Sequence, residues 1–254
     1  MKKDFFEPPE HYSRAWSADF SKPLDEDFWY IPNVERKGGY WSSKQAILDN
    51  NQLIIRTEYR DENPATRGYH SAVLCWKTLR ATYGYYEIRC KVDNIRGAWS
   101  AFWLMPDDIT QKEKKAQDGA EIDIFESALP YQLQTTIHYD NYTGHTTHSE
   151  RVKDYYDGFH TYAVDWQHDG LKFYYDGKLV WNVTNPDHIS HHPVRLEIST
   201  ELNGFHGKPN RFFWLGNGKI TSWRNRGKLP YDYVVDYVRV YDNGELKWSE
   251  GEIQ

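Results

Sequence analysis

Three carboxylates stand within six residues, separated by apolar side chains, in the stretch Glu121-Ile122-Asp123-Ile124-Phe125-Glu126. Successive side chains of a strand point to opposite faces, so Glu121 and Asp123 share one face while the isoleucines share the other. Like charges side by side on a sheet are destabilising, so the pattern calls for a function. Glycoside hydrolysis requires a pair of carboxylates on either side of the bond that is cleaved.

Glu126 has the wrong parity for this scheme, because it lies five positions after Glu121 and points to the core in a regular strand. A β-bulge with one extra residue, at Ile124 or Phe125, returns Glu126 to the acidic face, and bulges are common beside active sites. Four strand steps then separate the two glutamate Cα atoms by roughly 13 Å, and side chains leaning together bring the carboxyl groups to about 5–6 Å, near the retaining separation.

The pattern Glu-x-Asp-x-x-Glu on a strand resembles the active-site signature of glycoside hydrolase family 16 in its bulged variant. Further stretches resemble strands of this family in the same chain order, at residues 83–89, 97–106, 118–120, 136–139 and 235–241. The resemblance therefore covers most of the chain, from about residue 41 to residue 241. An ordered set of this kind is far more specific than the acidic stretch alone.

The resemblance implies a division of labour among the carboxylates. Glu121 is similar to the family's nucleophile, Glu126 to its acid/base residue, and Asp123 to the helper that orients the nucleophile. In a retaining mechanism the first attacks the anomeric carbon and the second passes a proton. Since an ionised Glu121 favours the protonated form of Glu126, we expect the two to differ in protonation.

Aromatic and histidine side chains are candidate substrate contacts. Trp99 and Trp103 share a face of their strand, and the resemblance implies a sugar-stacking floor; two core tryptophans are the alternative. His138 matches a family position beside the acid/base residue, with a purely structural histidine as the alternative. His145 and His148 have no acidic or thiol partners nearby in sequence, so we interpret them as part of a rim loop rather than as metal ligands.

No cofactor is expected for catalysis. Asp236 matches a position at which many family members hold a structural calcium ion. Calcium needs six to eight oxygen ligands, and one aspartate does not supply the others, so the sequence leaves this ion open.

The composition favours one all-β catalytic domain over residues 1–254, with 1–40 as an N-terminal extension and first strands. Strand-like runs at 52–57, 161–166, 171–175, 178–181 and 195–200 are separated by turn signals that include Asp-Gly pairs. The 11 Trp, 20 Tyr and 11 Phe residues suit both a core and sugar stacking. We expect an antiparallel β-sandwich of the jelly-roll, concanavalin-like type with an open substrate cleft. A helix-like stretch at 110–117 is interpreted as a loop insertion.

Charge and apolar content exclude several classes of partner. A net charge of −6 with mixed signs gives no basic footprint for nucleic acid or an anionic membrane. No run of about 18 apolar residues exists to span a membrane. We expect a monomer acting on a polysaccharide or oligosaccharide. A secreted or cell-surface location is the first expectation, although the sequence shows no secretory signal, and a cytoplasmic enzyme acting on imported oligosaccharides is the alternative.

The chain has two cysteines, Cys75 and Cys90. A hairpin turning near Thr82 and Tyr83 would place them opposite each other. We nevertheless favour two buried free thiols over a disulfide, because a chain of this size does not need the bridge.

Departures from the family pattern leave the substrate open. Laminarin-cleaving members typically carry proline after the first tryptophan of the aromatic strand, where this chain has Ser100. Their late Asn- and Gly-rich strand corresponds here to 197–205, followed by an aromatic loop at 212–223. We therefore predict an endo-acting, retaining hydrolase of β-1,3- or β-1,4-linked polysaccharide, with β-glucan first. The alternative substrate is galactan or a host glycan, cleaved by endo-β-galactosidase activity. A related alternative reaction is transglycosylation. The alternative from another class of protein is a non-catalytic lectin or carbohydrate-binding module.

Overall fold

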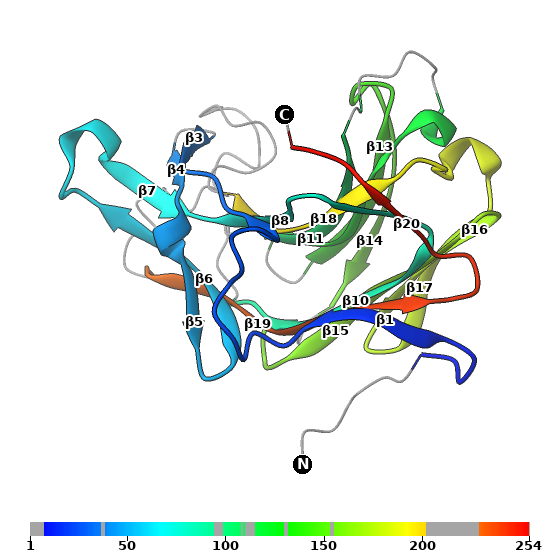
Figure 1. The fold of residues 1–254 in the computed structure, drawn as a ribbon, viewed down its shortest axis with the longest axis horizontal. Coiled ribbons are helices and arrows are strands. Elements are labelled where there is room, and N and C mark those ends of the chain that lie inside the picture. Colours follow the sequence, from blue (N-terminus) through cyan, green and yellow to red (C-terminus); the bar gives the residue numbers. More distant parts are fainter. Residues whose placement is uncertain are drawn as a thin grey trace.

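The computed structural model describes residues 8–36, 39–93, 99–107, 109, 115–129, 132–152, 155–201 and 229–253. Within them, two β-sheets lie one above the other (Figure 1). The described helical segments are single 3₁₀ turns at Ser43–Gln45, Pro64–Thr66, Ala116–Asp118 and Pro186–His188. The expected antiparallel β-sandwich of the jelly-roll type is confirmed.

The lower sheet in Figure 1 contains eleven strands of the described residues. Their spatial order is β17 (Lys178–Val183), β16 (Gly170–Tyr175), β15 (His160–Gln167), β10 (Gly84–Lys91), β19 (Tyr231–Asp242), β6 (Gln52–Arg60), β7 (Gly68–Ser71), β4 (Gly39–Trp41) and β3 (Val34–Arg36), with β1 (Ser13–Ala18) beside β19 and β5 (Ala46–Asp49) beside β6. The pair β4–β7 is parallel, whereas β10 runs antiparallel to both of its neighbours.

The upper sheet contains nine strands of the described residues and carries the acidic stretch. Their order is β14 (Gly144–Arg151), β13 (Gln132–Tyr139), β12 (Glu121–Leu129), β11 (Trp99–Pro106), β18 (Val194–Glu201), β8 (Val73–Trp76) and β2 (Trp29–Tyr30), with β9 (Leu79–Thr82) on β18 and β20 (Lys247–Glu250) on β9. In Figure 1, β3 and β4 lie on one side of the labels of β8, β11 and β18, and β13 lies on the other side.

The turn signals of the sequence form the hairpins that they predict. Asn50 and Asn51 join β5 to β6 with φ of 51° and 57°, and Asp176 and Gly177 join β16 to β17 with φ of 49° and 74°. Two successive residues with positive φ match the twist of the flanking strands, which explains the use of Asn, Asp and Gly here. All five strand-like runs expected from the sequence lie in strands.

The core lies between the two sheets and fixes the acidic strand to the lower one. Ile122, Ile124 and Phe125 of β12 are fully buried in it. The Phe125 ring stacks on the Tyr162 ring of β15, with centroids 4.2 Å apart. Such a contact adds to the burial of two large rings, so it holds β12 firmly against the opposite sheet.

Cys75 and Cys90 are both buried and free, as expected, but the hairpin imagined between them is wrong. Cys75 lies on β8 of the upper sheet and Cys90 on β10 of the lower one, because the chain crosses between sheets after β9.

Other expectations about organisation are not tested. Most of the 110–117 stretch lies outside the described residues. The assignment of 1–254 to one domain stays a prediction. Among the described residues, no helix has the length and apolar character needed to cross a membrane.

Candidate active site

A bulge at the predicted place brings Glu126 to the same face of the strand as Glu121 and Asp123. Against β11, Glu126 pairs with Ala101 and Asp123 with Trp103, and the register shifts between the two pairs. Against β13, the register shifts over the same residues. Ile124 and Phe125 both enter the core, so the following residue, Glu126, returns to the face of Asp123. We call this side of the upper sheet, which points away from the core, the outward face.

Glu126 is nearly buried, with 4% of its surface exposed. The Trp99 indole N–H donates to its Oε1 over 2.8 Å, and the Thr136 hydroxyl donates to its Oε2 over 3.1 Å. These donors come from β11 and β13, the two strands that flank β12. The sheet itself therefore fixes both oxygens of the carboxyl group that we assign to proton transfer.

Glu121 is more open and is held differently. It lies at the start of β12, half-buried, opposite His138 of β13. The hydroxyl of Tyr142, in the turn between β13 and β14, donates to Glu121 Oε2 over 2.8 Å. Burial, followed by the charge of Glu121, raises the pKa of Tyr142, so its hydroxyl keeps its proton and remains a donor.

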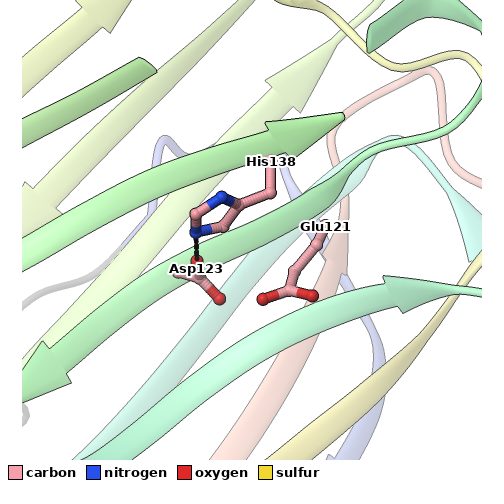
Figure 2. Close-up of side chains that lie close together, drawn as sticks. All are labelled: Glu121, Asp123 and His138. Atoms are coloured by element: carbon pink, nitrogen blue, oxygen red, sulfur yellow. Dashed lines mark ion pairs between the residues drawn. The ribbon is translucent and has the colours of Figure 1, made fainter. Parts of the chain in front are cut away.

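Asp123 lies between the two glutamates on the outward face and is 3% exposed. His138 reaches toward it from β13, with Nε2 3.5 Å from Asp123 Oδ2 (Figure 2). Burial lowers the pKa of His138 to about 4, and the neighbouring His145 adds to this shift. The ring is therefore neutral near pH 7 and acts as a polar support for Asp123 rather than as a fixed positive charge.

Glu121, Asp123 and His138 also have ligand atoms within 4.8 Å of one another, a spacing that a metal ion can bridge. The same side chains fill the positions that glycosidic chemistry requires, so no ion is assigned to them. His145 is exposed on the outward face opposite His138, whereas the His148 ring stacks on Trp181 of β17. Both histidines lie within β14, so their interpretation as part of a rim loop is wrong, and they point to different sides of that strand rather than toward a shared ion.

Trp99 and Trp103 share the outward face, half-buried, while Phe102 between them is in the core. Their indole N–H groups have polar partners there, Glu126 for Trp99 and the Ser199 hydroxyl, at 3.1 Å, for Trp103. Both rings thus belong to the partly polar surface predicted for sugar stacking rather than to the core. Their contact with sugar stays a prediction.

A second row of acids lies beside the tryptophans on β18, where Glu197 pairs across the sheet with Trp103 and Glu201 with Trp99. Both acids are neutralised by arginines. Arg195 Nε donates to Glu197 over 2.6 Å, and Arg36 donates to Glu201 over 2.5 Å. Each of these carboxylates already holds an arginine, whereas the acids of β12 match the bulged family pattern, so catalysis is assigned to β12.

Ser100 does not face the sugar-binding side. It is fully buried, and its hydroxyl lies 2.7 Å from the Tyr231 hydroxyl and 3.0 Å from that of Thr200. Its difference from the usual proline is thus a feature of the interior and gives no direct information on the substrate. The loop at 212–223 and most of the 197–205 stretch, from 202 onward, lie outside the described residues.

The calcium ion implied by the resemblance stays a prediction, and the described residues do not fit it. The buried Asp236 carboxylate pairs with the Arg89 guanidinium at 2.6 Å. Within the described part of the chain, Asp236 belongs to no group of acidic or histidine side chains spaced to hold an ion. A guanidinium already supplies the positive charge that a cation would bring.

Two residues of the site were missed from the sequence. Thr136 lies within a recognised strand, two positions before His138 and on the same face, so alternation alone could have found it. Tyr142 was not singled out in the sequence, because no local pattern shows that its hydroxyl reaches Glu121.

Known proteins resemble this chain over most of its length. A sequence profile of glycosyl hydrolases family 16 matches residues 36–234. A β-glucanase from Rhodothermus marinus is 28% identical over 271 residues, covering 94% of this chain and 87% of the relative. A keratan-sulfate endo-1,4-β-galactosidase from Sphingobacterium multivorum is 26% identical, covering 91% of this chain and 55% of the relative. The solved laminarinase from Rhodothermus marinus matches with a TM-score of 0.74 and 25% identity, over 94% of this chain and 99% of that one.

The family profile spans far more than half of the chain and includes the bulged acidic strand, the aromatic strand and His138. The non-catalytic lectin that the sequence left as an alternative is therefore set aside. This protein belongs to glycosyl hydrolases family 16 and is a glycoside hydrolase.

Proposed function

We propose that this enzyme cleaves internal bonds of a β-1,3- or β-1,4-linked polysaccharide by double displacement, with β-glucan as its first substrate. The observation that carries the proposal is the bulge of β12, which brings Glu121, Asp123 and Glu126 to one face. Two carboxyl groups on one strand beside half-buried tryptophans match what a retaining glycosidase needs. The named activities of the β-glucanase and laminarinase relatives support the choice of glucan.

In the first step, Glu121 attacks the anomeric carbon and forms a glycosyl-enzyme ester. The bond to the leaving oxygen breaks, and Glu126 gives that oxygen a proton. In the second step, Glu126 takes a proton from water while the water oxygen attacks the anomeric carbon. Glu121 then leaves as a carboxylate, and the configuration at the anomeric carbon is retained.

Asp123 and His138 support this cycle from positions beside the nucleophile. Asp123 lies between the glutamates, where its charge and hydrogen-bonding capacity act on the nucleophile. The neutral His138 ring occupies the other side of Asp123 and restricts its rotation. An orienting group of this kind reduces the motion needed to reach the transition state.

A β-galactoside polymer or host glycan is the second candidate substrate. The specific support is the similarity to a keratan-sulfate endo-1,4-β-galactosidase over 91% of this chain. Transglycosylation uses the same ester intermediate, with a sugar hydroxyl in place of water, and its products appear in the same assay.

A polysaccharide panel tests the proposal directly. Laminarin, mixed-linkage glucan, agarose-type galactan and mucin glycans are each incubated with the wild-type enzyme and with Glu121→Gln. Reducing ends are measured, and NMR follows the anomeric configuration of the first product. We expect the fastest release from a β-glucan, initial β-anomer, and almost no release by the variant. Initial α-anomer, or near-normal turnover by Glu121→Gln, would contradict the mechanism, and faster release from galactan would change the substrate.

We further propose a monomer that acts on its glycan outside the cell. A polymeric substrate, too large to be imported whole, supports this location. Size-exclusion chromatography with light scattering and fractionation of the producing cells test the two statements. A stable dimer, or enzyme confined to the cytoplasm, would contradict them.

A further inference from the structure

The turn between β13 and β14 has an unusual backbone. Asp140, Asn141 and Tyr142 follow one another with φ of 51°, 50° and 65°. Asp and Asn adopt this left-handed region several-fold more often than other non-glycine residues, but a bulky tyrosine there is uncommon. Residues held in such regions cluster at active sites and ligand clamps, where the surrounding structure enforces them.

The surrounding structure does fix this turn. The Asn141 N–H donates to the carbonyl of Ile109 over 3.1 Å, and the Thr143 N–H donates to the carbonyl of Asp140 over 3.0 Å. At the foot of the turn, the Tyr139 ring lies against Gly144 so closely that a Cβ atom there would collide with it. The backbone of Tyr142 therefore has little freedom.

This backbone points the Tyr142 side chain at the nucleophile. Its hydroxyl donates to Glu121 Oε2 over 2.8 Å, and its ring centroid lies 5.6 Å from that of His138. The residue is 48% exposed, yet burial of its phenol and the charges of Glu121 and Asp123 raise its pKa. The hydroxyl thus stays a donor throughout the pH range in which carboxylate chemistry operates.

We propose that Tyr142 is a positioning residue that holds Glu121 Oε2 and so leaves Oε1 to attack the anomeric carbon. This inference rests on the proposed function. During the first step, Oε1 forms the ester bond while the bond to the leaving oxygen breaks and that oxygen takes the proton of Glu126. The hydrogen bond from Tyr142 to Oε2 is kept throughout. Without it, Glu121, which is only half-buried, loses one of the contacts that orient it and spends less time in the conformation that reacts.

A competing role for Tyr142 is to bind substrate through its half-exposed ring. The two roles differ in which kinetic constant they affect. Loss of the hydroxyl alone removes positioning and lowers kcat, whereas loss of a stacking surface weakens binding and raises KM.

The test compares Tyr142→Phe with the wild-type enzyme and with Tyr59→Phe. Tyr59 is a matched control, since it is 50% exposed, packs edge-on against Tyr69, and lies on β6 of the lower sheet rather than on the sheet that carries β12. kcat and KM are measured on the polysaccharide that the wild type cleaves best. A 2-deoxy-2-fluoro-β-glycoside with a dinitrophenyl leaving group then reports ester formation alone, and mass mapping locates the label.

We expect Tyr142→Phe to lower kcat and the rate of labelling by about 10-fold, with KM within about 2-fold and an unchanged melting temperature. Tyr59→Phe should behave as the wild type. An unchanged kcat, or a raised KM with kcat unchanged, overturns the role of Tyr142. If the role of Tyr142 is overturned in this way but the wild type is still labelled at Glu121, the proposed function of the enzyme stands. A wild type that releases no sugar and takes no label at Glu121 overturns both.

Discussion

Glu126 and Glu121 lie on the same strand and on the same face, yet the first is held by the sheet and the second by a turn. Trp99 and Thr136, on the two flanking strands, donate to the two oxygens of Glu126. Glu121 is half-buried and accepts from Tyr142, in the turn beyond β13. Strand pairing fixes the surroundings of Glu126, whereas three left-handed residues fix those of Glu121.

The difference agrees with the two chemical roles. A proton carrier must meet the leaving oxygen at a fixed place, and it gains from a buried, rigid setting. A nucleophile must reach the anomeric carbon and then release it, so a less buried setting with a hydrogen bond to one oxygen suits it. Contacts made by residues of a turn also vary more readily among relatives than contacts made by residues within a sheet.

The largest expected effect separates the two glutamates by role. Glu121→Ala and Glu126→Ala should each lower kcat on an activated aryl glycoside by about 10³-fold. Added azide should restore turnover in both variants with opposite products. It replaces the missing nucleophile in Glu121→Ala and gives an α-glycosyl azide. In Glu126→Ala it attacks the glycosyl-enzyme and gives the β-glycosyl azide. NMR of the products checks this, and the same anomer from both variants would contradict the assignment.

The next effect tests the support of Glu126 by the sheet. Trp99→Phe removes the N–H that donates to Glu126, which is protonated before the first step, and a hydrogen bond of this kind is worth about 0.5–1.5 kcal/mol, so kcat should fall by up to about 10-fold. Trp103→Phe is the matched control, because the same change on the same strand removes only a bond to the Ser199 hydroxyl. Steady-state kinetics compare the two. Equal losses would mean that ring packing, not the donor, supports Glu126.

A smaller effect isolates the backbone of the turn from its side chain. Tyr142→Gly and Tyr142→Ala both remove the hydroxyl and should lose activity alike. At a φ of 65°, however, the alanine variant should be about 1 kcal/mol less stable than the glycine variant, or about 2–4 °C in melting temperature. Thermal unfolding measures the difference. Equal melting temperatures would show that the turn is not under strain.

The last effect concerns pH. His138 has its pKa lowered to about 4 by burial, against about 6.5 in an unfolded chain. Between these values the unfolded chain binds more protons than the folded one, so stability rises with pH from about 4 to 6.5 and this contribution is complete above that window. His138→Gln should flatten the rise in melting temperature between pH 4 and 7. An identical rise in both proteins would show that His138 is not the group responsible.

Local patterns predicted much of the site because strands impose a period of two. Glu126 could share a face with Glu121 only if the strand contained one extra residue, and the register places that residue between Asp123 and Glu126. Trp99 and Trp103 reached the outward face for the same reason. Alternation could also have found Thr136, although its contact with Glu126 depends on the register between β12 and β13.

Expectations from the sequence failed where the placement of a residue depended on a strand or side chain far away in the chain. Cys75 and Cys90 were placed on one hairpin, but the chain crosses between sheets after β9. Ser100 was used as a departure that leaves the substrate open, but its hydroxyl hydrogen-bonds with Tyr231 in the interior.

The sequence by itself determined the sandwich, the bulged acidic strand and the family to which the chain belongs. These follow from side-chain alternation, turn residues and motif spacing, all of which act over a few neighbouring residues. Only the tertiary structure decided what holds each glutamate, which acids are neutralised by arginine, and where Tyr142 points. Those outcomes depend on strand register and on the direction of a turn, and both are set by contacts between residues far apart in the chain.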